Sequence, residues 1–299
     1  VGDLDHPDLV NKIAYNYDDP INGIDDDADG YIDNYFGWDT GDNDNDPSSG
    51  FTSHGDNVAG LAAAETNNGI GIAGTGFNCK FLPIKIENNI GQLTGAYQAI
   101  VYAADQGVDI INCSWGSYSA SNFGNDIINY ATNKGSLVIC GAGNDGRNAK
   151  FYPAAYENAV AVAMTDSFDI MTSNSNYGYH IDLLAIGQGM ITTAKNANYS
   201  YNGGTSMASP LVSGAAALVK SHYPQFTPLQ IVEHLRNTAD DISARQPIEY
   251  IERMGGGRLN MFAAINDQLQ PGVRTSLISI LDGNDSAFVA GDTLRITFN

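Results

Sequence analysis

Short apolar runs rich in β-branched residues alternate with helical patterns along the middle of the chain. The apolar runs lie at residues 81–86, 108–112, 137–140, 160–164 and 181–186. The segments between them predict helices at about 93–106 and 125–134, followed by Gly107 and Gly135, the residue type that commonly ends a helix. Strands that alternate with helices imply right-handed crossovers. The pattern therefore predicts an α/β fold of three layers, a parallel sheet with helices on both faces.

The pattern changes towards the end of the chain. Thr227-Pro228 supplies an N-cap residue and a first helical residue, which predicts a closing amphipathic helix. Beyond it, Pro271-Gly272 marks a boundary, and residues 274–299 alternate apolar and polar positions as β-strands do. We therefore predict a main domain over residues 1–268. Residues 269–299 are predicted to be a linker and the beginning of a truncated β-sandwich domain.

Charge and hydropathy exclude two classes of partner. The 34 acidic and 14 basic residues give a formal net charge of −20, which opposes binding to a phosphate backbone. No apolar run approaches the roughly 20 residues that a membrane helix needs. We therefore expect neither nucleic acid as a partner nor a membrane span.

The cysteine count argues against a disulfide framework. Cys79, Cys113 and Cys140 lie in or beside apolar runs, and an odd number cannot pair fully within one chain. We expect buried thiols. Cysteine therefore does not indicate a cellular compartment.

The acids near the N-terminus form a recognisable pattern. Carboxylates alternate around a glycine at the sixth position, as in the first half of an EF-hand calcium loop, although Phe36 replaces the usual glutamate at the twelfth. The candidate ligands are the side chains of Asp25, Asp27, Asp29 and Asp33 and the carbonyl of Tyr31. A solvated acidic loop is the alternative. We favour a structural Ca²⁺ site because clustered carboxylates repel one another without a cation.

Two segments present a polar side chain at the start of a small-residue helix. Gly204-Thr205-Ser206-Met207-Ala208-Ser209-Pro210 presents Ser206, and Ser53-His54-Gly55 presents His54. A serine hydroxyl is a weak nucleophile until a base accepts its proton, so the pair suggests nucleophilic catalysis. By itself, Ser206 also fits a residue that caps a helix.

These two segments resemble the serine and histidine motifs of the subtilisin-like serine proteases, whose catalytic residues follow the order Asp, His, Ser. Residues 138–146 resemble the strand and turn that carry the oxyanion-hole asparagine, and residues 110–116 resemble the substrate-pairing strand. All four motifs occur in family order. The resemblance covers roughly residues 1–268 and implies a subtilisin-like fold.

The resemblance implies a role for each motif residue. Ser206 is the expected nucleophile, His54 the general base and acid, and Asn144 a donor to the oxyanion. Ser114, Trp115 and Gly116 are expected to pair with the substrate backbone. Trp115 either narrows the binding site or packs at the domain edge. For Asn144, the alternative is an ordinary turn residue.

The resemblance also locates the third catalytic residue. Val1-Gly2 resembles the tail of the family's Asp-x-Gly, which precedes a segment like His6-Pro7-Asp8-Leu9, while neither Asp3 nor Asp5 precedes x-Gly. We therefore expect the catalytic aspartate immediately upstream of Val1. Asp56-Asn57 departs from the family's Thr-His, and Asp56 could compete for the imidazole or raise its pKa.

Taken together, these features predict a secreted or surface-attached serine endopeptidase acting on polypeptides, with a possible N-terminal pro-segment and no cofactor for catalysis. The alternative is an inactive relative that serves as a peptide-binding or adhesion module. An α/β-hydrolase is excluded because Ser206 lacks the Gly-x-Ser-x-Gly motif and the histidine precedes it.

Overall fold

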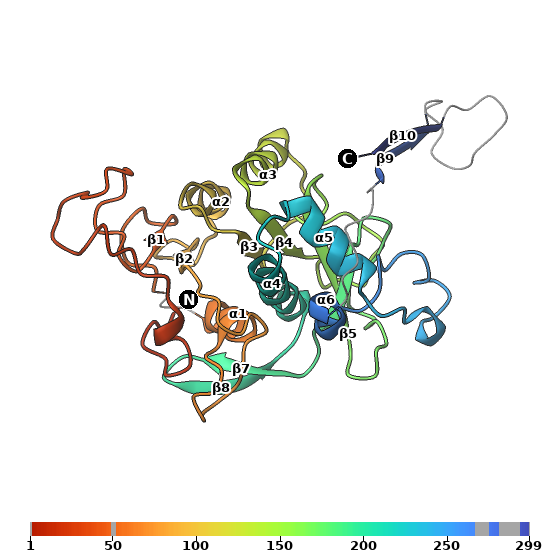
Figure 1. Ribbon diagram of the computed structural model, residues 1–299, viewed down its shortest axis with the longest axis horizontal. Coiled ribbons are helices and arrows are strands. Elements are labelled where there is room, and N and C mark those ends of the chain that lie inside the picture. The colour runs from red at the N-terminus through yellow and green to blue at the C-terminus, as the bar shows by residue number, and fades with distance from the viewer. Residues whose placement is uncertain (1, 49–51, 267–274, 281–293, 299) are drawn as a thin grey trace.

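A four-stranded parallel sheet lies at the centre of the main domain (Figure 1). The computed structural model describes residues 2–48, 52–266, 275–280 and 294–298. In spatial order, the strands are β3 (Ile110–Cys113), β4 (Leu137–Gly141), β5 (Ala159–Thr165) and β6 (Leu183–Ile186). The sequence predicted each of these strands. All of β4 and β5 is buried, as expected for parallel strands covered on both sides.

Helices cover both faces of this sheet, which confirms the three-layer prediction (Figure 1). On one face, Val138 and Cys140 of β4 pack in a core with α2 (Ala96–Asp105) and α3 (Asn122–Lys134). On the other face, Leu137 and Ile139 pack with α4 (Thr205–His222) and α5 (Pro228–Asn237). Successive β4 residues thus face opposite layers, as the period of a strand requires.

Helix ends follow the capping residues. The Ser121 side chain accepts a hydrogen bond from the Gly124 N–H, so α3 begins three residues before the expected Asn125. Gly135 ends α3 with φ +102°, and Thr227 and Gln230 form a capping box at the start of α5. Local chemistry therefore sets these boundaries.

A second, smaller parallel sheet pairs β1 (Trp38–Asp39) with β2 (Ile84–Lys85). The apolar run at 81–86 predicted a longer strand than β2. Within the described residues, β2 pairs with β1 alone and β3 pairs with β4 alone, although α2 connects β2 to β3 along the chain. No strand pairing therefore joins the two sheets within the described residues.

The remaining elements surround this core. α1 (His54–Ala63) packs on α4, and the antiparallel hairpin of β7 (Met190–Ala194) and β8 (Asn198–Asn202) packs against α1 (Figure 1). The sequence did not predict this hairpin. The other short elements are the 3₁₀ turns Val10–Lys12 and Ser243–Arg245 and the helix α6 (Met261–Asn266).

Near the C-terminus, β9 (Thr275–Ile280) and β10 (Leu294–Phe298) form an antiparallel pair. The predicted strands at 274–299 are therefore present. Their assignment to a truncated β-sandwich, and the division at residue 268, stay predictions. Residues 281–293, between the two strands, lie outside the described residues.

The three cysteines are free thiols, as expected, but Cys79 is only half-buried, contrary to the prediction of buried thiols. Cys113 and Cys140 are buried neighbours on β3 and β4. Burial raises the pKa of Cys140 well above its ordinary value, and the neighbouring Cys113 adds to the rise. None of the described helices combines the length and apolarity required to cross a bilayer.

Candidate active site

Ser206 lies in the first turn of α4, at the carboxyl ends of the central strands. Gly204 precedes the helix with φ +125°, a conformation that favours glycine. The end of β4 packs closely on this turn, because a Cβ on Gly141 would lie 3.0 Å from Thr205 Oγ1. The Ser206 hydroxyl is half-buried and donates to the Ser114 carbonyl at 3.3 Å. The backbone thus holds this hydroxyl at the helix N-terminus.

Asn144 lies beside the same turn. It follows β4 after Gly143, whose φ is +100°, and its Oδ1 accepts the Thr205 N–H at 2.8 Å. This bond leaves the Asn144 Nδ2 group free to donate. The Ser206 N–H belongs to the first helical turn, whose N–H groups have no acceptor within the helix. The arrangement therefore offers two donors to an anion formed at Ser206, as expected of an oxyanion hole.

Asn176 holds the loop that carries Asn144, a role that the sequence analysis missed. Its side chain is fully buried, and its Nδ2 donates to the Ala142 carbonyl at 2.9 Å. Its Oδ1 accepts the N–H groups of Asp145 and Arg147. No local pattern marks Asn176, because its partners lie about thirty positions earlier in the chain.

Hydroxyl groups connect β3 to α4 behind Ser206. Ser114 Oγ lies 2.9 Å from the Ser206 carbonyl and 3.0 Å from Ser209 Oγ. The Asn112 side chain donates to Ser114 Oγ and accepts from Ser213 Oγ. Asn112 of β3 therefore positions Ser114. Ser209 and Ser213 are four positions apart and therefore lie on one face of α4. This spacing is the feature of the sequence that could have indicated the hydroxyl network.

Trp115 and Gly116 continue from Ser114 along the expected substrate-pairing segment. The Trp115 ring packs edge-on against Tyr97 of α2, with centroids 5.4 Å apart, and also lines the neighbouring pocket. Gly116 lies against the chain at Tyr152, since a Cβ would approach the Tyr152 carbonyl oxygen to 2.4 Å. Trp115 therefore packs against a neighbouring side chain and lines the pocket, and its effect on substrate binding stays a prediction.

His54 is the first residue of α1 and its side chain is exposed. Its ring makes no hydrogen bond to Ser206 or to another side chain in the described part of the protein. Desolvation by the surrounding protein lowers the pKa of His54, and the negative charge of Glu87 opposes this shift. The structure thus brings Ser206, Asn144 and Ser114 together, but does not join His54 to them by a hydrogen bond.

Asp56 and Asn57 have structural contacts. The buried Asp56 Oδ1 accepts the N–H groups of Gly2 and Asp3 at 2.6 and 2.9 Å. Asn57 Nδ2 donates to the Thr193 carbonyl at 2.7 Å, which ties α1 to the β7–β8 hairpin. Asp56 and Asn57, which stand where the family has Thr-His, therefore make hydrogen bonds that hold neighbouring segments. The Asp56 carboxylate faces the N-terminal segment.

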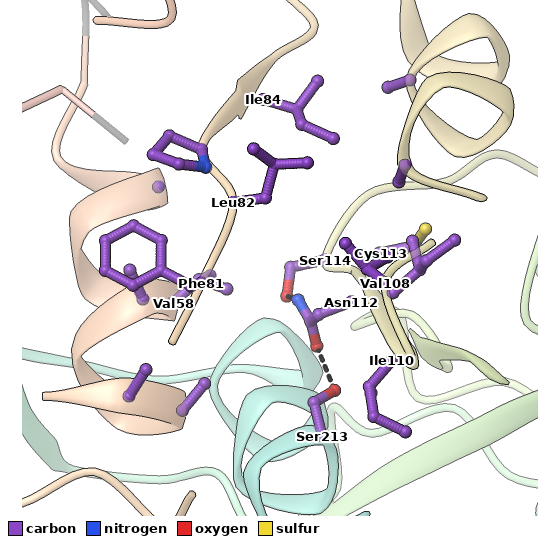
Figure 2. Close-up of a pocket in the computed structure, with 18 of the residues that line it drawn as sticks. Val58, Phe81, Leu82, Ile84, Val108, Ile110, Asn112, Cys113, Ser114 and Ser213 are labelled. Atoms are coloured by element: carbon purple, nitrogen blue, oxygen red, sulfur yellow. Dashed lines mark hydrogen bonds between the residues drawn. The ribbon is translucent and has the colours of Figure 1, made fainter. Parts of the chain in front are cut away.

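A pocket of about 1160 Å³ separates the two sheets beside this site (Figure 2). Apolar side chains line it from α1, from β2 and the residues before it, and from β3: Val58, Leu82, Ile84, Ile110 and Cys113. The Asn112–Ser213 bond lies along its wall (Figure 2). His54, Glu87 and Ser114 also line it. The pocket is therefore continuous with the surroundings of the candidate base.

The acidic loop brings together part of the predicted metal set. One carboxylate oxygen from each of Asp25, Asp27 and Asp29 lies within 4.8 Å of the others. Hydrogen bonding by Asn16 lowers the pKa of Asp27, which keeps that carboxylate ionised. Asp33 is directed elsewhere, because its carboxylate accepts the N–H groups of Asn22 and Gly23. The Tyr31 ring packs against Trp38 and Tyr102.

Comparison with known proteins gives a consistent result. The model of the subtilase family matches residues 3–269. The chain is 40% identical over 265 residues to a thermophilic serine proteinase of a Bacillus species, with 88% of this chain and 59% of that protein covered. It is 40% identical over 231 residues to thermitase of Thermoactinomyces vulgaris, covering 77% of this chain and 80% of that protein.

A solved structure gives the same picture. A protease of Pseudoalteromonas arctica matches with a TM-score of 0.70 and 32% identity, covering 88% of this chain and 86% of that one. The chain spans 59% of the length of the Bacillus relative, so the match concerns only part of that protein.

Proposed function

The chain belongs to the subtilase family, and on this premise we propose that it is a serine endopeptidase that hydrolyses peptide bonds of polypeptides. The observation that carries the proposal is the junction of β4 and α4. There, the Ser206 hydroxyl, the Ser206 N–H and the side chain of Asn144 share one helix N-terminus. A nucleophile beside two preorganised donors is suited to attack a carbonyl group.

The proposed reaction begins with transfer of the Ser206 Oγ proton to the neutral imidazole of His54, while Oγ bonds to the scissile carbonyl carbon. The carbonyl oxygen becomes an anion that accepts from Asn144 Nδ2 and the Ser206 N–H. His54 then gives its proton to the leaving amine as the C–N bond breaks. A water molecule then attacks the acyl carbon while His54 accepts its proton. The bond between that carbon and Ser206 Oγ breaks, and His54 returns the proton to Oγ, which releases the carboxylic acid product. The substrate backbone would lie along Ser114, Trp115 and Gly116 as an added strand.

We infer that the third catalytic residue is an aspartate N-terminal to Val1. Gly2 and Asp3 bond to Asp56 in the first turn of α1, so the segment that precedes them in the chain starts beside His54. That segment could form a further strand in the pocket between β2 and β3. Because His54 also lines this pocket, the strand would end beside His54. Its carboxylate would orient the imidazole and raise its pKa.

An inactive peptide-binding relative is the second candidate, favoured by the missing hydrogen bond between His54 and Ser206. Hydrolysis of a denatured, fluorescently labelled protein separates the two. We expect cleavage by the full chain, carrying the residues encoded before Val1, and none by its Ser206→Ala variant. Equal release by both proteins, or binding without cleavage, would argue for the inactive module.

We further propose that Asp25, Asp27 and Asp29 hold a structural Ca²⁺. Their clustered oxygens are hard ligands of the kind that calcium prefers, and three close negative charges repel one another without a cation. Backbone N–H groups of Asp29 and Gly30 bond to Asp25 and fix the loop in this arrangement. The ion would supply cross-linking of the loop and take no part in the reaction.

Thermal unfolding tests this site. Ca²⁺ at a hundred times its Kd stabilises a folded protein by about 2.7 kcal/mol, so EDTA should lower the Tm by several degrees. The Asp27→Asn variant should lose this response, whereas Asp18→Asn, an exposed acid outside the cluster, should keep it. An unchanged Tm with EDTA would contradict the site.

We propose a secreted or surface-attached location because the proposed function is that of a serine endopeptidase of the subtilase family. Fractionation of the source culture tests it, with the protein expected in the medium or on the cell surface.

A further inference from the structure

Phe151 lies between two segments that meet at Ser206. A Cβ on Gly116 would overlap the Phe151 ring, and a Cβ on Gly143 would lie 3.1 Å from its Cγ. Gly116 belongs to the expected substrate-pairing segment, whereas Gly143 directly precedes Asn144. Because neither glycine has a side chain, the ring approaches the backbone of both segments. The Phe151 ring therefore spans the space between them.

The proposed reaction brings a substrate side chain to the same space. The acyl carbon must reach Ser206 Oγ while its oxygen accepts from Asn144 Nδ2, and the adjoining backbone lies along residues 114–116. The substrate residue that carries the acyl carbon therefore lies between the two glycine-bearing segments. A strand directs alternate side chains to opposite faces, and the face turned towards the protein here meets the Phe151 ring.

Neighbouring groups hold the ring in this position. Tyr118 packs edge-on against Phe151, with ring centroids 5.1 Å apart. The Tyr118 hydroxyl accepts from the buried Asn176 Nδ2 at 3.0 Å. The residue after Phe151, Tyr152, exchanges two backbone hydrogen bonds with Ser117, at 2.7 and 2.8 Å. Displacing the ring would therefore disturb contacts that the loop of Asn144 shares.

Phe151 is also accessible to a ligand. It is only half-buried, so part of its surface is open to solvent. It does not line the pocket between the two sheets, so the strand inferred for that pocket leaves it uncovered.

We propose that Phe151 limits the size of the substrate side chain on the acyl side of the scissile bond, so that the preferred residue there is glycine, alanine or serine. This inference rests on the proposed function, since it names the substrate class of the same site. A leucine or phenylalanine side chain would overlap the ring, and closely packed groups resist such an overlap.

Hydrolysis of a series of peptide anilides tests the inference. The peptides share one uncharged sequence and carry alanine, leucine or phenylalanine directly before the anilide, so the cleaved bond is known. The full chain, with the residues encoded before Val1, should cleave the alanine substrate with a kcat/KM about tenfold or more above the values for the other two.

Phe151→Ala should reverse this order, because it leaves room for a larger substrate side chain. We expect the ratio of the leucine to the alanine kcat/KM to rise about 100-fold. Phe262→Ala removes the same ring from an exposed site on α6 and should keep the original ratio. Each ratio is measured within one protein, so a partly unfolded variant lowers both constants and leaves the comparison intact.

Equal kcat/KM values for the three substrates in the unaltered chain would overturn the inference, as would an alanine preference that survives Phe151→Ala. Binding of the corresponding labelled peptide amides to the Ser206→Ala variant, measured by fluorescence anisotropy, gives a readout without catalysis. A chain that hydrolyses no substrate but prefers the alanine peptide, and loses this preference when Phe151→Ala is added, would contradict the proposed function alone. Absence of both hydrolysis and selective binding would overturn both proposals.

Discussion

The serine and histidine sides of the candidate active site differ in how completely the described chain supports them. On the serine side, Asn144 bonds to the α4 backbone, Asn176 holds the loop of Asn144, and Ser114 bonds to Ser206. On the histidine side, the ring of His54 has no hydrogen bond to a described residue and lines the pocket. The residues near it, such as Asp56, bond to the backbone instead.

This difference indicates which parts of the mechanism local folding can assemble. The proposed oxyanion donors lie where a strand end and a helix start pack directly on each other. Orientation of the imidazole needs a carboxylate from another part of the protein. We therefore expect the serine side to be preorganised and the histidine side to depend on the inferred aspartate.

The largest expected effect comes from removing the nucleophile or the base. Ser206→Ala and His54→Ala should each lower kcat by about 10⁶-fold, as in subtilisin, because the two side chains act as one unit. Hydrolysis of a chromogenic peptide measures both. A loss of less than tenfold in His54→Ala would mean that the histidine side is not part of the active site.

A smaller effect is expected from the oxyanion donor on the serine side. Asn144→Ala should lower kcat by about 10²–10³-fold with little change in KM, because the donor acts mainly when the oxyanion forms. Steady-state kinetics at several substrate concentrations measure the two constants. If KM rose and kcat stayed constant, Asn144 would be an ordinary turn or substrate-binding residue.

The support beneath Asn144 should appear as stability. Asn176→Ala removes the buried bond to the Ala142 carbonyl and the acceptor of two loop N–H groups, so the free energy of unfolding should fall by about 1–3 kcal/mol. Urea unfolding measures this loss. Asn122→Ala, at an exposed residue near the start of α3, is the matched control and should change stability much less. Equal losses of stability in the two variants would contradict a role of Asn176 in holding the loop of Asn144.

The smallest effect concerns pH on the histidine side. Glu87 raises the pKa of His54, so Glu87→Gln should lower it, and the imidazole would stay neutral to lower pH. The acid limb of the kcat/KM profile, measured with a peptide that lacks basic residues, should therefore move to lower pH. Glu157→Gln should leave the limb in place. A shift to higher pH would contradict the assigned contact.

The sequence predicted the central sheet, and it placed Asn144 and Ser206 in turns that adjoin in the structure, because both features depend on local signals. Apolar runs marked β3 to β6, and glycines beside Asn144 and Ser206 marked the turns at their ends. The histidine motif was equally visible, but its missing bond to Ser206 was not. Distances between segments 152 positions apart depend on tertiary packing, which periodicity does not report.

Other features could not be predicted for the same reason. The β7–β8 hairpin is held by bonds from Thr192 and Thr193 to Asn57 and Asp56, more than 130 positions away in the chain. The acidic pattern at Asp25 to Asp33 predicted a cluster, yet Asp33 bonds to backbone N–H groups outside it. Sequence spacing identified the candidate ligands but did not determine their directions.

Reaction with a fluorophosphonate probe tests the central claim most directly, because only an activated serine beside an oxyanion hole reacts rapidly. The full chain, with the residues encoded before Val1, is treated and digested, and the modified peptide is identified by mass spectrometry. The account predicts one adduct on Ser206 that disappears in His54→Ala. An unmodified Ser206, or equal labelling in His54→Ala, would contradict a nucleophile activated by this histidine.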